Sequence, residues 1–436
     1  MKNYLSTAVL LFTLLCNCKK SKDDGGTNPP APAFSINTIS PSSGPFETIV
    51  TITGTGFSTV SSENTVKFNG VVATVQSATA TQLTAKVPKG AGSGAVTVTK
   101  GSQTATGPTF TYILTGTVST LAGSDNGFAN GTGTAAKFSF PVGICTDAAG
   151  NIYVGDASND QVRKITPAGV VSSFAGSTQG FADGTGTAAK FNSPLGITID
   201  ASGNFYVGDI GNFAVRKMNT ASVVSLLAGG TEGNLNGQGA SAQFKYPVGV
   251  CADASGNIYV ADNKNHLIRK ITPTGAVTTF AGSGSSGNAD GTGTAAQFEE
   301  PYGICSDAAG NIYVADNLSS RIRKITPAGV VTTIAGSAGA GFADGSAATA
   351  KFNQPNGICV DAQGNIYVSD YNNNRIRKIT TAGDVSTLAG SGLQGNTDGP
   401  ALQARFNRPG HICITADGII YLADRYNHRI RKIAME

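Results

Sequence analysis

A chain of 436 residues is too long for one ordinary domain, so two or three domains are expected. Charged residues make up only 13% of it while glycine occurs 57 times, which is typical of turn-rich, exported all-β proteins and not of helical or disordered ones. The net charge of +4 is small for this length and is not gathered in a basic stretch, which excludes nucleic acid as an expected partner.

Residues 1–18 have the features of an export signal. A basic second residue precedes an apolar run over residues 5–15 that is too short to cross a bilayer. The run meets Cys16 and Cys18 and then a polar stretch, an arrangement that resembles a bacterial lipoprotein signal. A leucine three residues before it favours Cys18 as the lipidated residue, with Cys16 as the alternative; a secretory signal with incidental cysteines also fits. The resemblance implies an outer-membrane lipoprotein of a Gram-negative bacterium that faces the surface or the periplasm.

Residues 19–33 are rich in Lys, Ser, Asp, Gly and Pro and are predicted to form a flexible tether. Residues 34–112 contain short alternating segments separated by turn residues at the spacing of a β-sandwich. The domain resembles the IPT/TIG family in ISPSSGP at 39–45, GTGF at 54–57, VKFNG at 66–70 and FTY at 110–112. The resemblance implies an immunoglobulin-like sandwich, and we interpret it as a spacer because no catalytic constellation is visible in it.

Residues 113–436 consist of six copies of one unit. Each copy has an aspartate at the end of a strand-like run and an arginine seven residues later, and the copies recur every 53 or 54 residues. The aspartates are Asp156, Asp209, Asp262, Asp316, Asp370 and Asp424, and the arginines are Arg163, Arg216, Arg269, Arg323, Arg377 and Arg431. A repeat this regular indicates one supersecondary unit stacked on copies of itself.

Each copy contains four strand-like runs, which describes a propeller blade. The last copy stops at Ile433 after its third run, and the missing fourth run is found at residues 116–124, where it would close the ring. The fold class predicted is all-β: an immunoglobulin-like sandwich followed by a six-bladed β-propeller with a split closing blade. The pattern Pro-x-Gly-Ile-x-x-Asp-x-x-Gly-Asn-Ile-Tyr-Val-Ala-Asp-x-x-Asn-x-x-Ile-Arg-Lys-Ile resembles the NHL repeat over residues 116–433, with longer inter-blade segments than that family usually has.

One face of such a propeller carries uniform tight turns, and the loops of the other face differ from copy to copy. A single asymmetric ligand needs residues that break the symmetry, and the copies disagree most in blades four to six. The predicted ligand-binding residues are Tyr302, Asn356, Tyr371, His411, Arg425 and Tyr426. Aromatic rings with amide and guanidinium groups suit a peptide, protein or glycan. Drift of exposed loop residues is the alternative explanation.

The other repeated polar residues are expected to be structural. The six strand-end aspartates are too dispersed for one metal ion, and each is expected to cap its own turn through backbone N–H groups. Acidic residues of the long inter-blade segments are expected to be turn residues as well, with calcium binding as the alternative; these are Asp183, Asp290, Asp344 and Asp398. Five cysteines share one strand position that should lie beyond disulfide reach, about 7 Å between Cα atoms, and are expected to be free; they are Cys145, Cys251, Cys305, Cys359 and Cys413.

Six-bladed relatives of the NHL type include a zinc-dependent amidating lyase, calcium-dependent lactonases and a streptogramin lyase, all of which need clustered metal ligands or a histidine base. Only His411 is placed for such work, and one imidazole does not make a metal site. We therefore expect a lipid-anchored, cell-envelope binding protein without a cofactor or metal. Two alternatives stay open: a propeller lyase or hydrolase with a site around His411, and a structural adhesion or scaffold subunit.

Overall fold

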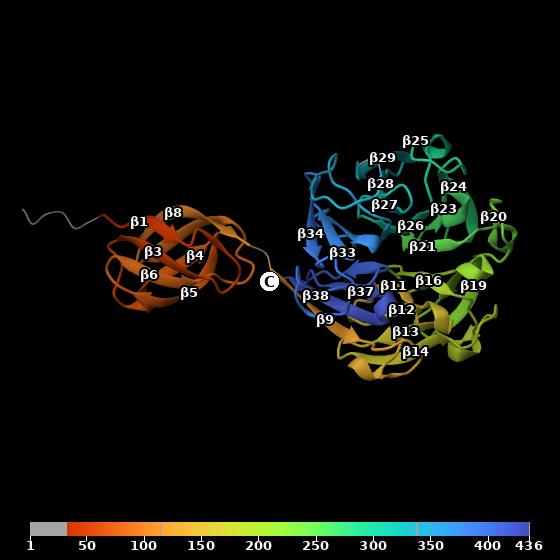
Figure 1. The fold of residues 1–436 in the computed structure, drawn as a ribbon, viewed down its shortest axis with the longest axis horizontal. Helices are drawn as coiled ribbons and strands as arrows, with labels where there is room; N and C mark the ends of the chain where they lie inside the picture. The colour runs from red at the N-terminus through yellow and green to blue at the C-terminus, as the bar shows by residue number, and fades with distance from the viewer. Residues whose placement is uncertain (1–32, 114, 337–338, 436) are drawn as a thin grey trace, which may run out of the picture. The chain divides into compact units, whose positions relative to one another are not determined.

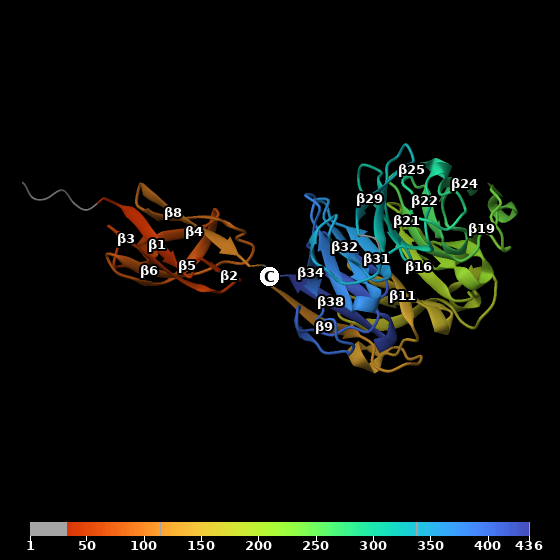
Figure 2. The same ribbon diagram turned by 45° about the horizontal axis from the view of Figure 1, so that its top comes forward.

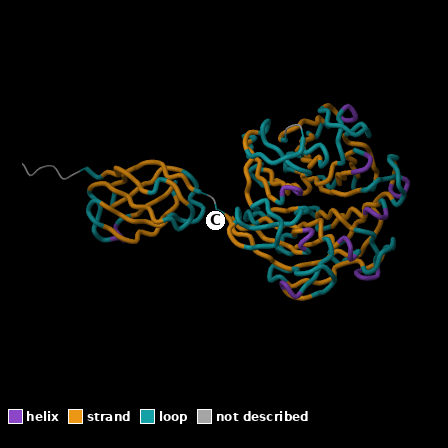
Figure 3. The backbone as a smooth tube through the Cα atoms, viewed as in Figure 1, coloured by secondary structure: helices purple, strands orange, loops and turns teal. Residues whose placement is uncertain are grey.

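The computed structural model describes residues 33–113, 115–336 and 339–435, and the chain divides after Ile113 into two compact units. The predicted lipoprotein signal, with Cys16 and Cys18, lies outside the described residues. Strands and loops make up almost all of the described chain (Figure 3). None of its helices has the length and apolar character to cross a membrane.

The first unit is a sandwich built by alternation of buried and exposed residues. Its strands are β1 (Ser35–Ser40), β2 (Ser43–Gly44), β3 (Ile49–Thr55), β4 (Thr65–Phe68), β5 (Val71–Ala78), β6 (Gln82–Lys86), β7 (Gly94–Lys100) and β8 (Gln103–Tyr112). In β3, Val50 and Ile52 are buried and the threonines next to them are partly exposed. The strands (Figure 1) pair in the order β1-β3-β6-β5-β4-β7-β8-β2. They surround one core, in which the rings of Phe68 and Phe110 meet edge to face. The predicted immunoglobulin-like sandwich is confirmed.

The described part of residues 115–435 forms six five-stranded sheets, the blades of a propeller (Figure 1, Figure 2). The innermost strands are β11 (Pro141–Thr146), β16 (Pro194–Ile199), β21 (Pro247–Ala252), β26 (Pro301–Ser306), β31 (Pro355–Val360) and β36 (Ile412–Ile414). The second strands are β12 (Ile152–Asp156), β17 (Phe205–Asp209), β22 (Ile258–Asp262), β27 (Ile312–Asp316), β32 (Ile366–Asp370) and β37 (Ile420–Asp424). The third strands are β13 (Gln161–Ile165), β18 (Ala214–Met218), β23 (Leu267–Ile271), β28 (Arg321–Ile325), β33 (Arg375–Ile379) and β38 (Arg429–Met435).

The fourth strands are β14 (Val170–Gly176), β19 (Val223–Gly229), β24 (Ala276–Ala281), β29 (Val330–Ala335), β34 (Asp384–Ala389) and β9 (Gly116–Ala122). Each blade also has a two-residue outer strand that the sequence did not predict, contributed by the long inter-blade segments. These strands are β10 (Gly131–Thr132), β15 (Gly184–Thr185), β20 (Gly237–Gln238), β25 (Gly291–Thr292), β30 (Gly345–Ser346) and β35 (Gly399–Pro400).

The ring closes as predicted, through a sixth blade assembled from both ends of the region. β9 pairs antiparallel with β38, so that Val118 lies opposite Ile433 and Thr120 opposite Arg431. Asp398 fastens this joint, because its carboxylate accepts the backbone N–H of Thr120 at 3.0 Å and the guanidinium of Arg431 at 2.7 Å. A closed ring leaves no long sheet edge between the first and last blades.

The blades are held together by apolar layers between neighbouring sheets. One such layer joins Val162 of blade one to Phe191, Ile197 and Phe205 of blade two, all of them buried. Similar clusters recur at the other junctions, so each sheet buries its faces only against its neighbours.

At the centre, the innermost strands approach one another backbone to backbone at a ring of glycines. A Cβ atom on Gly143 would lie 1.9 Å from the carbonyl oxygen of Leu195, so no larger residue fits there without a backbone shift. The same holds in the next four blades, at Gly196, Gly249, Gly303 and Gly357. In blade six the corresponding residue is His411, which breaks the symmetry on the axis of the propeller.

Candidate functional site on the variable face

The repeated aspartate and arginine form a buried ion pair in every blade. The guanidinium Nη1 and the carboxylate Oδ2 are 2.6–3.1 Å apart, and both side chains are fully buried. The structural role predicted for the aspartates agrees with this, but the predicted partner was wrong. Oδ1 accepts a backbone N–H from the loop before the innermost strand, as at Ser139 for Asp156 (2.7 Å), and not from the aspartate's own turn. The turn is instead contacted through the side chain of Asn159.

Burial is the largest influence on these carboxylates. It raises the pKa of Asp262, Asp316 and Asp424 to about 6, although the N–H donors and the arginine act in the opposite direction. The groups therefore stay ionised at neutral pH.

The acidic residues of the long inter-blade segments also bind the buried arginines. In blade four, Asp290 accepts the Nη2 group of Arg323 at 2.8 Å and the backbone N–H of Thr333 at 3.0 Å. Blades one and three use Asn130 and Asn236 in the same position. The prediction that these are only turn residues is corrected, because each of them also forms an ion pair with the buried arginine 33 residues later in the sequence.

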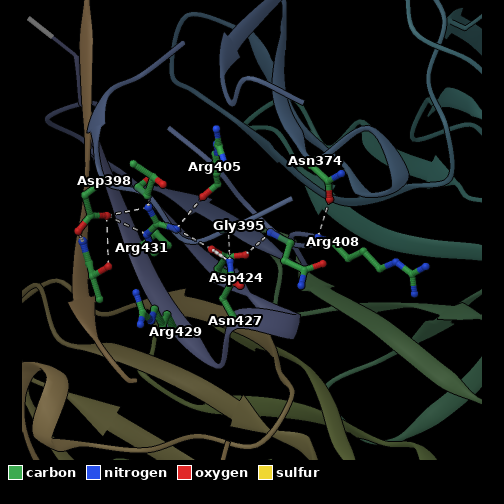
Figure 4. A network of polar contacts seen from close by, with 12 residues as sticks. Asn374, Gly395, Asp398, Arg405, Arg408, Asp424, Asn427, Arg429 and Arg431 are labelled. Atoms are coloured by element: carbon green, nitrogen blue, oxygen red, sulfur yellow. Dashed lines mark hydrogen bonds and ion pairs between the residues drawn. The ribbon is translucent and has the colours of Figure 1, made fainter. Parts of the chain in front are cut away.

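Blade six shows the whole network. Figure 4 shows Arg431 between Asp424 on one side and Asp398 on the other, while Arg408 extends away from them. The backbone N–H of Arg408 donates to the side chain of Asn374 in blade five at 2.9 Å (Figure 4). The negative charges of Asp424 and Asp398 are therefore already paired with Arg431 within the fold.

The hydrogen bond between Arg408 and Asn374 is one of several in which a backbone N–H of one blade donates to a side chain of the adjacent blade. His428 closes the ring in this way, because its Nδ1 atom accepts the backbone N–H of Phe140 at 3.2 Å, and His266 does the same for Glu300. These two histidines are therefore structural. The residue whose N–H donates in these hydrogen bonds precedes a proline. The residue at that position has a positive φ in all six blades, which directs its side chain differently from that of a strand residue.

The six predicted site residues come from two kinds of position on one face. Tyr302 and Asn356 lie on the innermost strands β26 and β31, and His411 lies one residue before β36. Tyr371, Arg425 and Tyr426 lie in the short 3-10 turns after the second strands, η9 (Tyr371–Asn373) and η10 (Arg425–Asn427).

Tyr302 and His411 are brought together although their blades are not adjacent. Their ring centroids are 5.7 Å apart and the rings meet edge to face. Burial, followed by the charge of Arg425, lowers the pKa of His411 to about 4, so the imidazole is neutral at pH 7. Its Nε2 atom is buried and has no hydrogen-bond partner within the described chain, and the same is true of the Oδ1 atom of Asn356 and the Nε atom of Arg425.

Tyr371 and Tyr426 form a second group together with Arg408 and Arg425. Their ring centroids are 6.5 Å apart, and the Arg408 guanidinium lies 5.8 Å from the first ring and 5.1 Å from the second. Arg425 lies 5.7 Å from the ring of Tyr426, and Phe140 contacts that ring edge to face. Hydrogen bonding with Tyr371, together with the arginine charges, lowers the pKa of Tyr426, whereas burial raises that of Tyr371 to about 12.

Blades one to three fill the same part of the face with aliphatic side chains. Val142, Leu195 and Val248 occupy the positions of Tyr302, Asn356 and Gly410, and they form a buried cluster against which Tyr302 packs. The face is therefore filled by packed apolar side chains on one side of the axis and carries polar side chains on the other.

Sequence comparison between the copies missed two residues of the polar side. Arg408 lies before the proline, outside the two kinds of position that carry the predicted site, although the residue before the proline differs in every copy. Ser369 was overlooked because it replaces alanine or glycine inside a strand. It is fully buried, accepts the N–H of Gly357 at 2.6 Å and donates to the carbonyl of Gly410 at 2.5 Å, which joins blades five and six beside His411.

The innermost strands line a cavity of about 260 Å³ that is open to solvent on one side and that His411 also lines. All five cysteines of the described chain line it and are free, as predicted. Burial raises the pKa of the Cys413 thiol to about 12. Within the described residues, no group of three or more His, Cys, Asp or Glu side chains is arranged to hold a metal ion. The chemistry that the face offers is hydrogen bonding, ring stacking and positive charge.

Comparison with known families matches residues 35–112 to the IPT/TIG domain and residues 244–271, 352–379 and 406–433 to the NHL repeat. Among curated proteins, the chain is 29% identical over 317 residues to Protein SUPPRESSOR OF QUENCHING 1, chloroplastic, of Arabidopsis thaliana, covering 67% of this chain and 30% of that protein. It is 28% identical over 339 residues to NHL repeat-containing protein 2 of Bos taurus, covering 68% and 47%. The chain thus spans less than half the length of these curated relatives.

Solved structures with the same fold come from Bacteroides. A structural genomics protein of Bacteroides thetaiotaomicron VPI-5482 has a TM-score of 0.61 and 24% identity, covering 94% of this chain and 99% of that one. An auxiliary nutrient binding protein of Bacteroides ovatus ATCC 8483 has a TM-score of 0.59 and 19% identity, covering 92% and 98%. The chain therefore carries an IPT/TIG domain followed by a six-bladed β-propeller that contains NHL repeats.

Proposed function

We propose that this chain is a lipid-anchored binding protein of the bacterial cell envelope, whose propeller recognises a peptide, protein or glycan on the polar side of its variable face. The observation that carries the proposal is the set of three buried, unpaired polar atoms on Asn356, His411 and Arg425. An unsatisfied buried polar group costs about 1–3 kcal/mol, so native folds rarely keep several together without a purpose.

A purely structural role explains these three unpaired atoms less well than a binding role does. Six other arginines also have an unpaired buried Nε atom. Five are the repeat arginines, so the fold repeats that feature in five blades, and the sixth is Arg321 of blade four, whose Nη1 group donates to the carbonyl of Asn288. The three atoms of the polar side come from different positions and from blades five and six only. At these positions the other blades have aliphatic, small or amide side chains or an aromatic ring (Tyr302, Tyr371). Solved propellers of this fold that bear the name auxiliary nutrient binding protein are consistent with a binding role.

A glycan and peptide array tests the proposal with variants that copy sister blades. Asn356→Val introduces the residue of blades one and three, His411→Gly the residue of five blades, and Arg425→Ala the residue of blade one. Each should keep the fold and bind the ligand more weakly. Arg425→Ala should lose at least about tenfold in affinity, because a hydrogen bond to a charged group contributes about 1.5–3 kcal/mol, and the two variants of neutral side chains about two- to tenfold, because an ordinary hydrogen bond contributes about 0.5–1.5 kcal/mol. Gln363→Ala, on the opposite face, is the control and should bind as the unaltered protein does.

The array also separates the alternatives. If every variant keeps its affinity, the polar side is not the binding site; if nothing binds at all, a scaffold role becomes the better explanation. Mass spectrometry of each bound ligand would reveal turnover, which would favour a lyase or hydrolase that uses His411.

The lipid anchor is tested independently of the propeller. Expressed in a Gram-negative host, the protein should incorporate labelled palmitate and fractionate with the outer membrane. Cys18→Ser should abolish both properties while Cys16→Ser should not. The opposite result would move the modified residue to Cys16, and the absence of label in all forms would exclude the anchor.

A further inference from the structure

Two unpaired arginines stand out on the polar side of the variable face. Neither Arg408 nor Arg425 forms an ion pair with any described residue, whereas Arg431 of the same blade binds two carboxylates. Elsewhere on this face a comparable charge is neutralised: Lys264 of blade three binds Glu300 of blade four at 2.5 Å. The junction of blades five and six has no such acidic partner, so its positive charge is available to a ligand.

The two arginines are held beside aromatic rings that orient them. Arg408 reaches both Tyr371 and Tyr426, while Arg425 contacts Tyr426 and acts on His411 by its charge. All of these side chains except His411 come from turns, where sister blades accept unrelated residues. The cluster is therefore not a requirement of the blade. A guanidinium held against a ring binds carboxylates in a fixed, often bidentate geometry.

The main chain of this region is already engaged. The backbone N–H of Arg408 donates to Asn374, that of His411 to the carbonyl of Val142, and that of Tyr426 to the carbonyl of Asn407. Recognition of an extended peptide normally adds a strand to a sheet edge or uses paired backbone donors. The available groups here are rings, guanidinium groups, an amide and an imidazole, which suit a sugar ring that carries hydroxyls and a negative charge.

We propose that the ligand of the polar side is an acidic sugar, and that Arg408 and Arg425 bind its carboxylate beside the rings of Tyr371 and Tyr426. Asn356 and His411 then offer hydrogen bonds to the hydroxyl groups of the same sugar. This inference rests on the proposed function, which it deepens by naming the chemical class of the ligand.

Matched pairs of probes test it with the full chain. Calorimetry would compare trigalacturonate with its methyl ester, and sialyllactose with lactose, since each pair differs mainly in charge. We expect the acid of at least one pair to bind at least tenfold more tightly than its neutral partner. Its affinity should also fall as NaCl rises from 50 to 500 mM.

The variants again copy sister blades. Arg408→Gln, the residue of blade five, and Arg425→Ala should each weaken the acid by at least tenfold and leave the neutral probe unchanged. Arg405→Gln, which copies blades three and four, removes one positive charge from an exposed position outside the cluster and should change neither. Melting temperatures within about 3 °C of the unaltered protein would show that the variants fold.

Each remaining outcome counts against the inference. If no acid binds more tightly than its neutral partner, the acidic-sugar assignment is wrong, although neutral array ligands lost in the His411→Gly variant would leave the binding function standing. If octaglutamate binds more tightly than every sugar, the ligand is an acidic peptide. If no probe and no array ligand binds, the proposed function itself fails.

Discussion

Tyr302 of blade four and His411 of blade six meet edge to face, with their ring planes inclined by 82°. Five blades place glycine where blade six has His411, so this imidazole occupies a point at which the propeller otherwise permits no side chain. It lies between the variable face, where Tyr302 holds it, and the central cavity that it helps to line.

The titration of His411 is the first prediction. Burial and the charge of Arg425 lower its pKa to about 4, so histidine NMR should show one of three imidazoles titrating near that value, and His411→Gly should remove that signal. The unfolded chain takes up the proton first, near pH 6.5. The stability that the neutral imidazole contributes is therefore present above pH 6.5 and is lost as the pH falls through 4.

Linkage limits this effect to about 3 kcal/mol, because each pKa unit corresponds to about 1.4 kcal/mol. We expect the unfolding free energy of the unaltered protein, relative to that of His411→Gly, to fall as the pH is lowered from 8 to 4; urea unfolding at each pH measures it. A midpoint near 6.5 in the folded protein would mean that the imidazole is solvated, contrary to the buried position described here.

Much of this architecture could be predicted because it is repeated. Six copies of the run that ends at Asp316, and an Arg323 that keeps step with it, establish strand order, blade number and closure without any knowledge of contacts. The partners of these residues could not be predicted, because they lie far away in sequence: Asp316 accepts the N–H of Glu299, and Arg323 binds Asp290. The disagreement between copies located Tyr302 and His411, but Arg408 needed the contact between blades five and six to become visible.

Substitution of Asp316, which forms the buried ion pair with Arg323, should destabilise the fold far more than substitution of Asp290, the outer carboxylate that binds the same guanidinium. Asp316→Asn leaves the Arg323 guanidinium without its buried charge partner and presents an amide N–H to the donor of Glu299, so we expect a loss of about 3–5 kcal/mol. Asp290→Asn reproduces blades one and three, where asparagine accepts the same guanidinium, and should cost less than about 1 kcal/mol. Urea unfolding of both variants measures the difference; equal losses would mean that the two carboxylates share the charge of Arg323 evenly.

Closure of the ring should depend on the short N-terminal strand. A chain that begins at residue 113 retains β9, whereas one that begins at residue 124 lacks it and exposes the edge of β38. The first should melt as the propeller does in the full chain. The second should melt at least 10 °C lower or self-associate through the free edge, because an unpaired strand is a template for another chain. Calorimetry and light scattering check both results, and equal melting temperatures would show that β9 does not hold the ring closed.

The five cysteines of the propeller should report when the ring opens. Burial raises the pKa of Cys413 to about 12, so its thiolate at pH 8 should be about a thousandfold scarcer than that of an ordinary cysteine, and the other four are also shifted upward. In a chain that begins after Cys18, a thiol reagent should label none within an hour in buffer and all five at once in denaturant. Thr198→Cys, at the matching position of blade two, should behave like them, whereas Ser202→Cys on an exposed turn should react immediately. Rapid labelling of one native thiol would mean that the pKa of this thiol is not raised in the folded protein.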